Sequence, residues 1–228
     1  VSPPATPMQV KVALDDALLS AGVQYLYGAM LTDVLKDENG LPAGIVMANR
    51  AGRQAVIAKQ IIDATPRSVV ARHAGAHFDT YPAGPQVFKR VVIGGEMQRP
   101  GQVETRAITP SFQGANGDYP IFEYTLREYL ADGSYAAYMR ADQRARTLTY
   151  HEDQQYTSDV HFEVPPDALH SKAVSQGAWE GVDCLPMGAF QPADVERLYV
   201  LGGCAGISRQ QARQLVRPIW QIDLGARV

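Results

Sequence analysis

The chain has 228 residues, of which 46% are apolar and 20% charged, and its 24 acidic and 21 basic side chains give a net charge of -3. This composition is typical of a globular, soluble protein and excludes a disordered chain. No apolar run reaches the roughly 20 residues that a membrane-spanning helix needs. Both signs of charge are scattered, without the basic stripe that binds phosphate backbones. We therefore expect neither a membrane nor a nucleic acid as a partner.

The two cysteines and the first residues carry little information on location. Cys184 and Cys204 are too few for a disulfide framework and too far apart for a redox pair or a zinc knuckle, so we expect free, buried thiols. The start VSPPATPMQV lacks the basic and apolar regions of a signal peptide. Its prolines indicate a linker or an extended lead-in, which predicts that the chain was cut from a longer one. The cellular compartment stays open.

The first elements in chain order are a helix and a meander of strands. From Met8 to Ala21, apolar residues recur at three- and four-residue steps, and Gly22 follows, which predicts one amphipathic helix. Residues 23–58 hold short β-rich runs separated by the turn DENG and an Ala-Gly turn. This pattern predicts a β-meander of two or three antiparallel strands.

The run KQIIDAT, residues 59–65, predicts a short apolar strand at a buried, central position of a sheet. A helix is predicted directly after it, from about Pro66 to Ala74. Pro66 suits the first helical position because its missing N–H would have no partner there anyway. Gly75 suits the residue that ends the helix.

Residues 81–185 predict a separate, mainly antiparallel lobe, with alternating strands broken by Pro and Gly and one helical piece from about Pro120 to Tyr129. From Arg197 a buried-strand pattern returns in LYVLGGCAGISRQQARQLV, a strand, a Gly-rich turn and a helix. The predicted organisation is a first lobe with the β-meander at 1–80, the antiparallel lobe at 81–185, and the return strand and helix of the first lobe at 186–228.

The Gly-rich turn is the strongest candidate site. Gly202, Gly203 and Gly206 follow the strand, and Ser208 with Gln211 forms a capping box that marks a helix start. Small residues and free N–H groups at such a turn suit an electron-rich ligand. Close packing of helix against strand explains the same glycines, and the two readings stay open. No part of the chain carries the G-x-G-x-x-G motif that cradles a dinucleotide pyrophosphate.

The order of these pieces resembles FAD-dependent oxidoreductases of the glutathione-reductase-like flavoprotein superfamily. A helix, a β-meander, IIDAT, a helix ending in AGA, an antiparallel lobe and LYVLGGCAGIS follow one another as in that family, without its N-terminal G-x-G-x-x-G unit. The resemblance implies an α/β fold, in part α+β: a partial FAD/NAD(P)-binding-like layer with the β-meander, plus the antiparallel lobe for substrate.

The resemblance also implies flavin contacts. Ala64 and Thr65 match the family's Ala-Thr-Gly motif, in which Pro66 replaces the glycine. Gly202 matches the glycine of a Gly-Asp pair, and Gly203 replaces its aspartate. The residues that match the start of the family's last helix, which faces the flavin ring, are Ala205, Gly206, Ile207 and Ser208.

Other chemistry-bearing residues give weaker signals. His73 and His77 lie four apart but Gly75 separates them, so a helix cap or a surface position explains them better than a metal site. His161 alternates with Val160 and Phe162, which suits either the substrate lobe or a plain sheet surface. Cys204 is best explained as a small buried residue. The aromatic residues that could line a pocket or form core are Tyr119, Phe122, Tyr124, Tyr129, Tyr135 and Tyr138.

Two functions follow. The first is a fragment of a flavoprotein oxidoreductase that passes a hydride between a small-molecule substrate and FAD, with the flavin between residues 58–66 and 200–208. The second is a non-catalytic binding or scaffold module that kept the fold and lost the cofactor, which Pro66 and Gly203 favour. A parallel sheet without its first strands leaves an open edge, so we expect a homo-oligomer or pairing with a missing N-terminal segment.

Overall fold

The computed structural model describes residues 6–81, 83–114 and 116–228. The helices are α1 (Pro7–Ser20), α2 (Val69–Ala74), α3 (Tyr135–Thr149), α4 (Arg209–Leu215) and α5 (Pro218–Arg227). The strands are β1 (Met30–Lys36), β2 (Pro42–Asn49), β3 (Gly52–Ile57), β4 (Ile61–Asp63), β5 (Phe78–Thr80), β6 (Gly84–Gly94), β7 (Glu104–Gly114), β8 (Gly117–Leu130), β9 (Gln154–Ser158), β10 (Asp167–Leu169) and β11 (Leu198–Val200). The predicted α/β class is confirmed.

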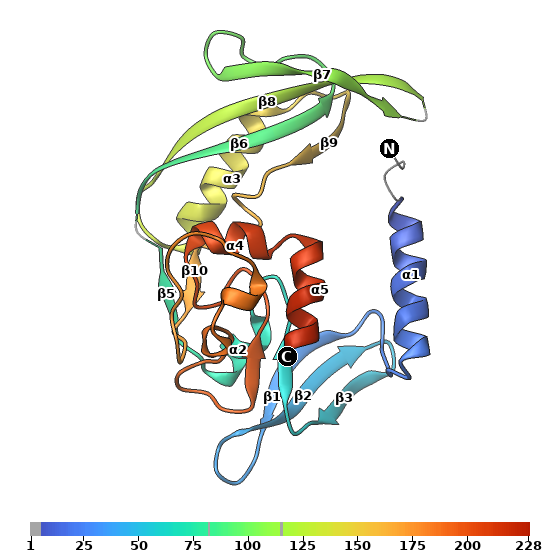
Figure 1. Cartoon of the computed structure of the whole chain (residues 1–228), viewed down its shortest axis with the longest axis vertical. Coiled ribbons are helices and arrows are strands. Elements are labelled where there is room, and N and C mark those ends of the chain that lie inside the picture. Colours follow the sequence, from blue (N-terminus) through green and yellow to red (C-terminus); the bar gives the residue numbers. More distant parts are fainter. Residues whose placement is uncertain (1–5, 82, 115) are drawn as a thin grey trace.

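The strands divide into small sheets with different directions. β1, β2 and β3 form the antiparallel meander that the sequence predicts, and β6 to β9 form a four-stranded antiparallel sheet in the order β7-β8-β6-β9. β4 pairs in parallel with β11, and β5 pairs antiparallel with β10. The meander and the four-stranded sheet lie at opposite ends of the molecule, with the parallel pair between them (Figure 1).

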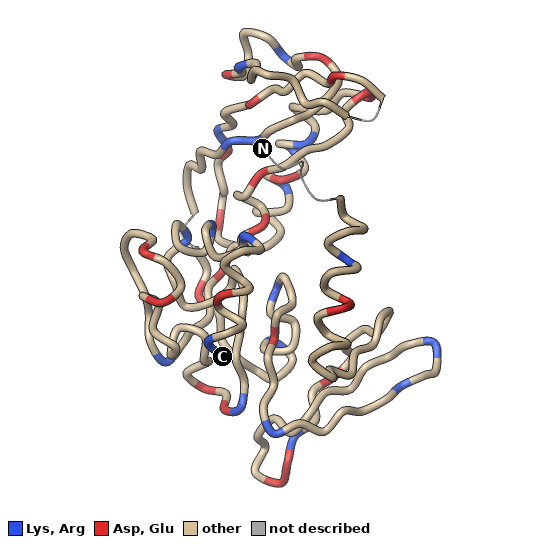
Figure 2. The backbone as a smooth tube through the Cα atoms, turned by 45° about the vertical axis from the view of Figure 1, so that its right-hand side comes forward, with Lys and Arg blue, Asp and Glu red and all other residues tan. Residues whose placement is uncertain are grey.

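Helix α1 forms as predicted but packs against little. Thr6 caps it: its hydroxyl accepts from the Gln9 amide at 3.3 Å, and the Gln9 side chain accepts from the Thr6 amide at 2.8 Å. Gly22, at φ 67°, follows its last turn. The helix buries none of its residues, and both views show it standing apart from the body of the chain (Figures 1 and 2). Its apolar face, with Val10 and Leu14, is exposed.

Strand β4 differs from its prediction as a fully buried, central strand. Ile61 and Asp63 are buried, but Ile62 between them is 53% exposed. Within the described residues, β4 has only β11 as a neighbour. β4 therefore has one paired neighbour among the described residues, and only the face that carries Ile61 and Asp63 is covered.

Helix α2 begins later than predicted. It starts at Val69, and Ser68 precedes it in the left-handed conformation at φ 50° and ψ 49°. Pro66 lies instead in a tight turn that the Ser68 amide closes onto the Thr65 carbonyl at 3.1 Å. The placement of Pro66 at the first helical position was wrong, because proline fits the second position of a turn equally well. The predicted end at Gly75, φ 98°, is confirmed.

The predicted helix over 120–129 is wrong. These residues belong to strand β8, where Phe122, Tyr124 and Leu126 are buried and the residues between them are more exposed. Such burial of every second residue is the period of a strand. The helix of this lobe, α3, starts only after Ser134, whose hydroxyl caps it.

The packing of the core also differs from the predicted boundary at residue 185. After β9 the chain returns to the central part, where Val164, Val182 and Leu185 share one core with residues of α4 and α5. Trp179 and Trp220 pack against this core. Their rings contact each other edge to face, with centroids 5.4 Å apart. The four-stranded sheet and α3 have a core of their own around Phe88 and Tyr124. His161 and Phe162 still pack on the sheet core, and from Val164 onward the residues pack with the central part that holds the 186–228 segment.

No helix of the described residues is long and apolar enough to cross a membrane. Lys and Arg are interspersed with Asp and Glu over the chain as a whole (Figure 2).

Candidate functional site

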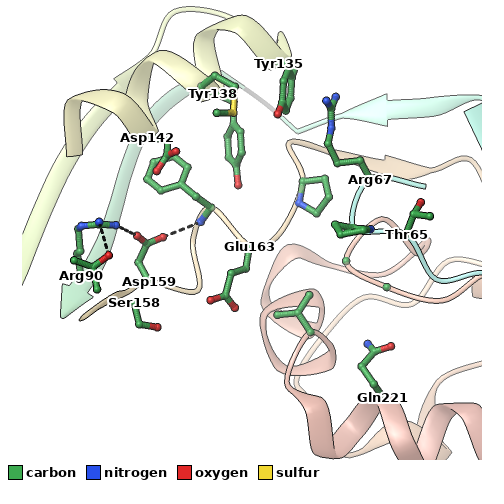
Figure 3. A pocket seen from close by; sticks show the side chains of 18 of the residues that line it. Thr65, Arg67, Arg90, Tyr135, Tyr138, Asp142, Ser158, Asp159, Glu163 and Gln221 are labelled. Carbon is green, nitrogen blue, oxygen red and sulfur yellow. Dashed lines mark hydrogen bonds and ion pairs between the residues drawn. The ribbon is translucent and has the colours of Figure 1, made fainter. Parts of the chain in front are cut away.

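A cavity of about 700 Å³ lies between the ends of the parallel strands and the inner side of the four-stranded lobe (Figure 3). We call it the strand-end pocket. Residues 64–67 and 201–203 form one wall, directly after β4 and β11, and Gln221 of α5 lies nearby. The opposite wall consists of residues of α3 and of the segment 157–163.

The parallel pairing of β4 and β11 creates the first wall. Ile61 is paired with Leu198 and Asp63 with Val200, so both strands end at the same edge. In open α/β sheets, ligands bind outside this carboxyl edge. Two segments more than a hundred positions apart in the sequence therefore meet where a ligand would be expected.

Asp63 holds the first of these segments in place. Its side chain is buried and accepts the Thr65 amide at 3.0 Å, the Thr65 hydroxyl at 2.6 Å and the Ala71 amide at 2.8 Å. The Thr65 hydroxyl in turn accepts from the Val69 amide at 2.8 Å. Sequence reasoning did not single out Asp63. An Asp followed two positions later by Thr after an apolar strand is the signal for this kind of turn.

Ala64, Thr65, Gly202 and Gly203 line the strand-end pocket, so the structure brings together the predicted cofactor residues that follow the two strands. Within the described part of the chain, the amides of Gly202 and Gly203 donate to no protein acceptor. A Cβ atom on Gly202 would meet nothing within 4 Å, whereas one on Gly203 would meet Pro165 Cδ at 2.9 Å. Gly203 is thus needed for packing, and Gly202 leaves its space to the pocket.

The other four predicted cofactor residues, Ala205, Gly206, Ile207 and Ser208, do not line this pocket. Their amides already donate to the carbonyls of Gly202, Ala189, Ala205 and Ser175, at 3.1, 2.8, 2.7 and 2.9 Å respectively. Their contact with a cofactor stays a prediction, and none of them has an amide free for it.

Close packing leaves no room for a side chain at Gly206, so a larger residue there should destabilise the fold. A Cβ atom there would lie 1.8 Å from Ser171 Oγ and 2.7 Å from Ser171 Cβ. We expect Gly206→Ala to lower the free energy of unfolding by about 1–3 kcal/mol, the usual cost of overpacking, measured by urea denaturation. Adding Ser171→Gly should recover part of the loss. Gly225→Ala, in open space on α5, is the matched control. Equal stability of the Gly206 and Gly225 variants would contradict the packing role.

The charged residues of the strand-end pocket are mostly paired. Arg90 and Asp159 form a buried ion pair, and Arg90 also donates to Thr149 at 3.1 Å and Thr157 at 3.0 Å. Asp142 accepts from Arg146 at 2.9 Å. Glu163 differs, because within the described residues its carboxylate has neither a hydrogen bond nor an ion pair. Burial, with the nearby charge of Asp159, raises the pKa of Glu163.

Figure 3 shows how these side chains are directed. Asp159 turns toward Arg90 and toward the Phe162 amide, whereas Glu163 points into the open space between the lobe and α5. Arg67 lies over the ring of Tyr135, with its Cζ atom 3.4 Å from the ring centroid. One unpaired carboxylate and one cation held on an aromatic ring therefore face the same cavity.

His161 lies in a turn after β9, not in a strand, and it is buried. Its ring stacks on Phe88 with centroids 4.4 Å apart, and its Nδ1 atom lies 2.7 Å from Arg213 Nη2. Burial, together with the charges of Arg209 and Arg213, lowers the pKa of His161 to about 3. The imidazole is therefore neutral and accepts a hydrogen bond from Arg213.

The cysteines and the remaining histidines do not form a site. Cys204 is buried, and burial raises the pKa of its thiol to about 11, which agrees with a small packed residue. Cys184 is exposed, so its predicted burial was wrong, and both thiols are free. His77 contacts Asp194, away from His73. No group of three or more metal-type ligands occurs among the residues the structure describes.

The aromatic residues divide between pocket and core. Tyr135 and Tyr138 line the strand-end pocket, whereas Phe122 and Tyr124 are buried in the sheet core and Tyr129 is exposed.

Comparison with known families gives a partial match. Residues 2–89 match the sequence model of the family described as FAD dependent oxidoreductase. The match extends from α1 through the meander, β4 and α2 into β6, and it includes Ala64 and Thr65. The match covers less than half of the chain and supports the predicted likeness to FAD-dependent oxidoreductases for that part; the narrower superfamily stays a prediction. No curated protein matches the chain.

Several solved structures are similar in outline. CabE, an aromatic hydroxylase from angucycline biosynthesis, is 16% identical over 97% of this chain and 44% of its own, with a TM-score of 0.48. The p-nitrophenol 4-monooxygenase of Pseudomonas putida is 11% identical over 93% of this chain and 51% of its own, with a TM-score of 0.48. A flavin-dependent brominase triple mutant is 12% identical over 95% and 54%, with a TM-score of 0.47. The chain thus spans about half the length of these proteins.

Proposed function

We propose that the chain is part of a flavoprotein oxidoreductase in which the strand-end pocket receives the ring system of FAD together with a small-molecule substrate. One observation carries the proposal: Gly202 and Gly203, whose backbone amides donate to no protein acceptor among the described residues, line a cavity of about 700 Å³ at the carboxyl edge of two parallel strands. Oxygen and nitrogen atoms at the edge of a flavin ring can accept from such amides.

The pocket residues fit the ring better than they fit the rest of the cofactor. Ala64, Pro66 and Gly202 give small or flat walls against which a planar ring can lie. The pyrophosphate cradle G-x-G-x-x-G does not occur in this sequence. We therefore infer that this chain supplies contacts to the ring and that its contacts to the phosphates contribute less.

When bound, FAD supplies the redox chemistry by accepting or returning a hydride. The residues of the chain orient the substrate and handle its proton. Among the described residues, Glu163 lines the pocket without a hydrogen bond or an ion pair, and burial with the charge of Asp159 raises its pKa, which makes it a stronger base toward a substrate proton than an ordinary glutamate. Arg67, held on Tyr135, is placed to attract the electron-rich end of a substrate.

The alternative is a binding or scaffold module without a cofactor. Pro66 favours it, because this ring lines the pocket at a position where the resemblance places a glycine. The two functions differ in whether the purified chain takes up flavin.

The test is flavin binding by the chain itself. FAD and riboflavin are titrated separately, with absorbance and quenching of flavin fluorescence as readouts. We expect both flavins to bind. The affinity for FAD should exceed the affinity for riboflavin by less than tenfold, because the sequence lacks the G-x-G-x-x-G cradle that would bind the FAD phosphates. Gly202→Leu should reduce the affinity for both at least tenfold, since its side chain enters the cavity.

The matched control is Gly225→Leu. This glycine also has open space where a Cβ atom would lie, but it sits on α5 outside the strand-end pocket. Its flavin affinity should equal that of the unchanged chain. If the chain binds neither flavin, the alternative of a binding or scaffold module without a cofactor applies to this chain. If both glycine variants bind as well as the unchanged chain, the flavin lies elsewhere and the proposed site is wrong.

A further inference from the structure

A second cavity of about 240 Å³ adjoins the strand-end pocket, and the proposed function does not use it. We call it the Arg209 cavity. Tyr81 and Gln86 contribute one wall, the start of α3 with Ser134 another, and Arg209 at the start of α4 a third. Tyr138 lines both cavities, which makes them neighbours.

Arg209 brings an uncompensated positive charge to this cavity. Its guanidinium donates to the carbonyls of Pro165 at 2.9 Å and His161 at 2.8 Å, and no carboxylate among the described residues forms an ion pair with it. Its Nε atom is buried and has no hydrogen-bond partner in that part of the chain. Arg213, one turn later, donates to the neutral His161. A partly buried cation whose partners are all neutral favours an anion in its vicinity.

Tyr81 adds a second unpaired donor. Its hydroxyl is buried and has no hydrogen-bond partner among the described residues. Its ring centroid lies 5.1 Å from the Arg209 Cζ atom, so the two unsatisfied groups belong to one cluster. Burial raises the pKa of Tyr81 to about 12, which keeps the phenol protonated and able to donate. A buried donor that stays unpaired costs about 1–3 kcal/mol, and a ligand oxygen would remove that cost.

The start of α3 adds a third contribution of the same sign. Ser134 caps this helix of 15 residues, and Gly133 and Ser134 both line the cavity. The N-terminus of a helix carries a partial positive charge. The cavity therefore combines a guanidinium, a phenol and a helix start, and the described residues that line it include no Asp or Glu.

The size of the Arg209 cavity and its apolar walls favour an organic anion over an inorganic one. A cavity of about 150 Å³ in another protein holds benzene, so about 240 Å³ accommodates a small ring with a substituent. Leu130, Pro166 and the Tyr138 ring give apolar surface beside the donors. We propose that the Arg209 cavity binds a small monocarboxylic acid, with its carboxylate on Arg209 and Tyr81 and its apolar body against Leu130 and Tyr138.

The test uses benzoate and hexanoate as probes and their neutral amides, benzamide and hexanamide, as controls, with binding measured by calorimetry on the flavin-free chain. We expect at least one acid to bind at one site per chain and its amide to bind at least tenfold more weakly. Tyr81→Phe should lower the affinity for the acid about tenfold, which is the loss expected for one hydrogen bond to a charged group. The variant should fold normally, because the hydroxyl that it removes has no hydrogen-bond partner among the described residues.

Two controls locate the site. Tyr129→Phe makes the same change on a tyrosine that is 72% exposed and should leave binding unchanged. Gly202→Leu, which fills the strand-end pocket, should also leave acid binding unchanged, so failure of the flavin proposal does not affect this test. The proposal is overturned if neither acid binds, if acid and amide bind equally, if inorganic phosphate competes as well as the acid, or if Tyr81→Phe binds like the unchanged chain.

Discussion

Replacing Asp159 with Ala is expected to lower the free energy of unfolding by about 3–5 kcal/mol, because it leaves the buried Arg90 guanidinium without its counter-ion. The side chains of Arg90 and Asp159 are each only 4% exposed. Asp159 also accepts the Phe162 amide at 3.1 Å, so the variant loses a contact that shapes the turn after β9. Urea denaturation followed by far-UV circular dichroism measures the effect.

An exposed ion pair is the matched control for Asp159. Glu104 and Arg127 have side chains 67% and 69% exposed, and Glu104→Ala should change stability by less than about 1 kcal/mol. The double variant Asp159→Ala, Arg90→Leu should be more stable than Asp159→Ala alone, because it removes the unpaired charge. Equal costs for Asp159→Ala and Glu104→Ala would show that water reaches Arg90 freely.

The second large effect is a loss of stability in acid that arises from His161. The imidazole has an ordinary pKa of 6.5 in the unfolded chain, and in the fold burial and the two arginines lower its pKa to about 3. Between these two values the unfolded state binds a proton that the folded state does not. Stability therefore falls as the pH falls through this window, by up to about 1.4 kcal/mol per pH unit, and His161 adds no pH dependence above it.

The measurement compares the chain with His161→Gln, which keeps an acceptor for Arg213 but does not titrate. Carboxylates contribute to the loss of stability at low pH in both proteins. The difference between the two curves of stability against pH therefore isolates the contribution of His161. We expect the curves to run parallel from pH 7 to 9 and the unchanged chain to lose stability faster from pH 6 to 4. Parallel curves over the whole range would mean that the folded imidazole takes up its proton as easily as the unfolded one.

Much of the fold could be predicted because the relevant signals are local. The α1 helix follows from apolar spacing and Gly22, the meander from its turns, and the end of α2 from Gly75. The start of α2 could not be predicted from Pro66 alone. The buried Asp63 side chain takes the Thr65 and Ala71 amides, and this contact sets where the helix begins. A proline fits both a turn and a first helical position, so only the contact decides between them.

The candidate site was predictable in part for the same reason. Ala64, Thr65, Gly202 and Gly203 follow recognisable strands, and parallel pairing brings them to one edge. The far wall was not predictable, because residues 120–129 were read as a helix and the turn after β9 as a strand. Arg90 lies on β6, whereas Asp159 and Glu163 follow β9, and the long-range pairing of β6 with β9 brings them to the same wall. The Gly206 contact with Ser171 is likewise a long-range steric effect.

The pairing of Trp179 with Trp220 determines what an optical experiment on this protein can report. They are the two tryptophans of the chain, and both pack against the core that includes α4 and α5. Intrinsic tryptophan emission therefore follows that core and is silent about the four-stranded sheet, whose own core contains no tryptophan. A substitution that loosens only the sheet would leave the emission curve unchanged while its ellipticity falls. The two spectroscopic signals together thus show whether the two cores melt as one cooperative unit.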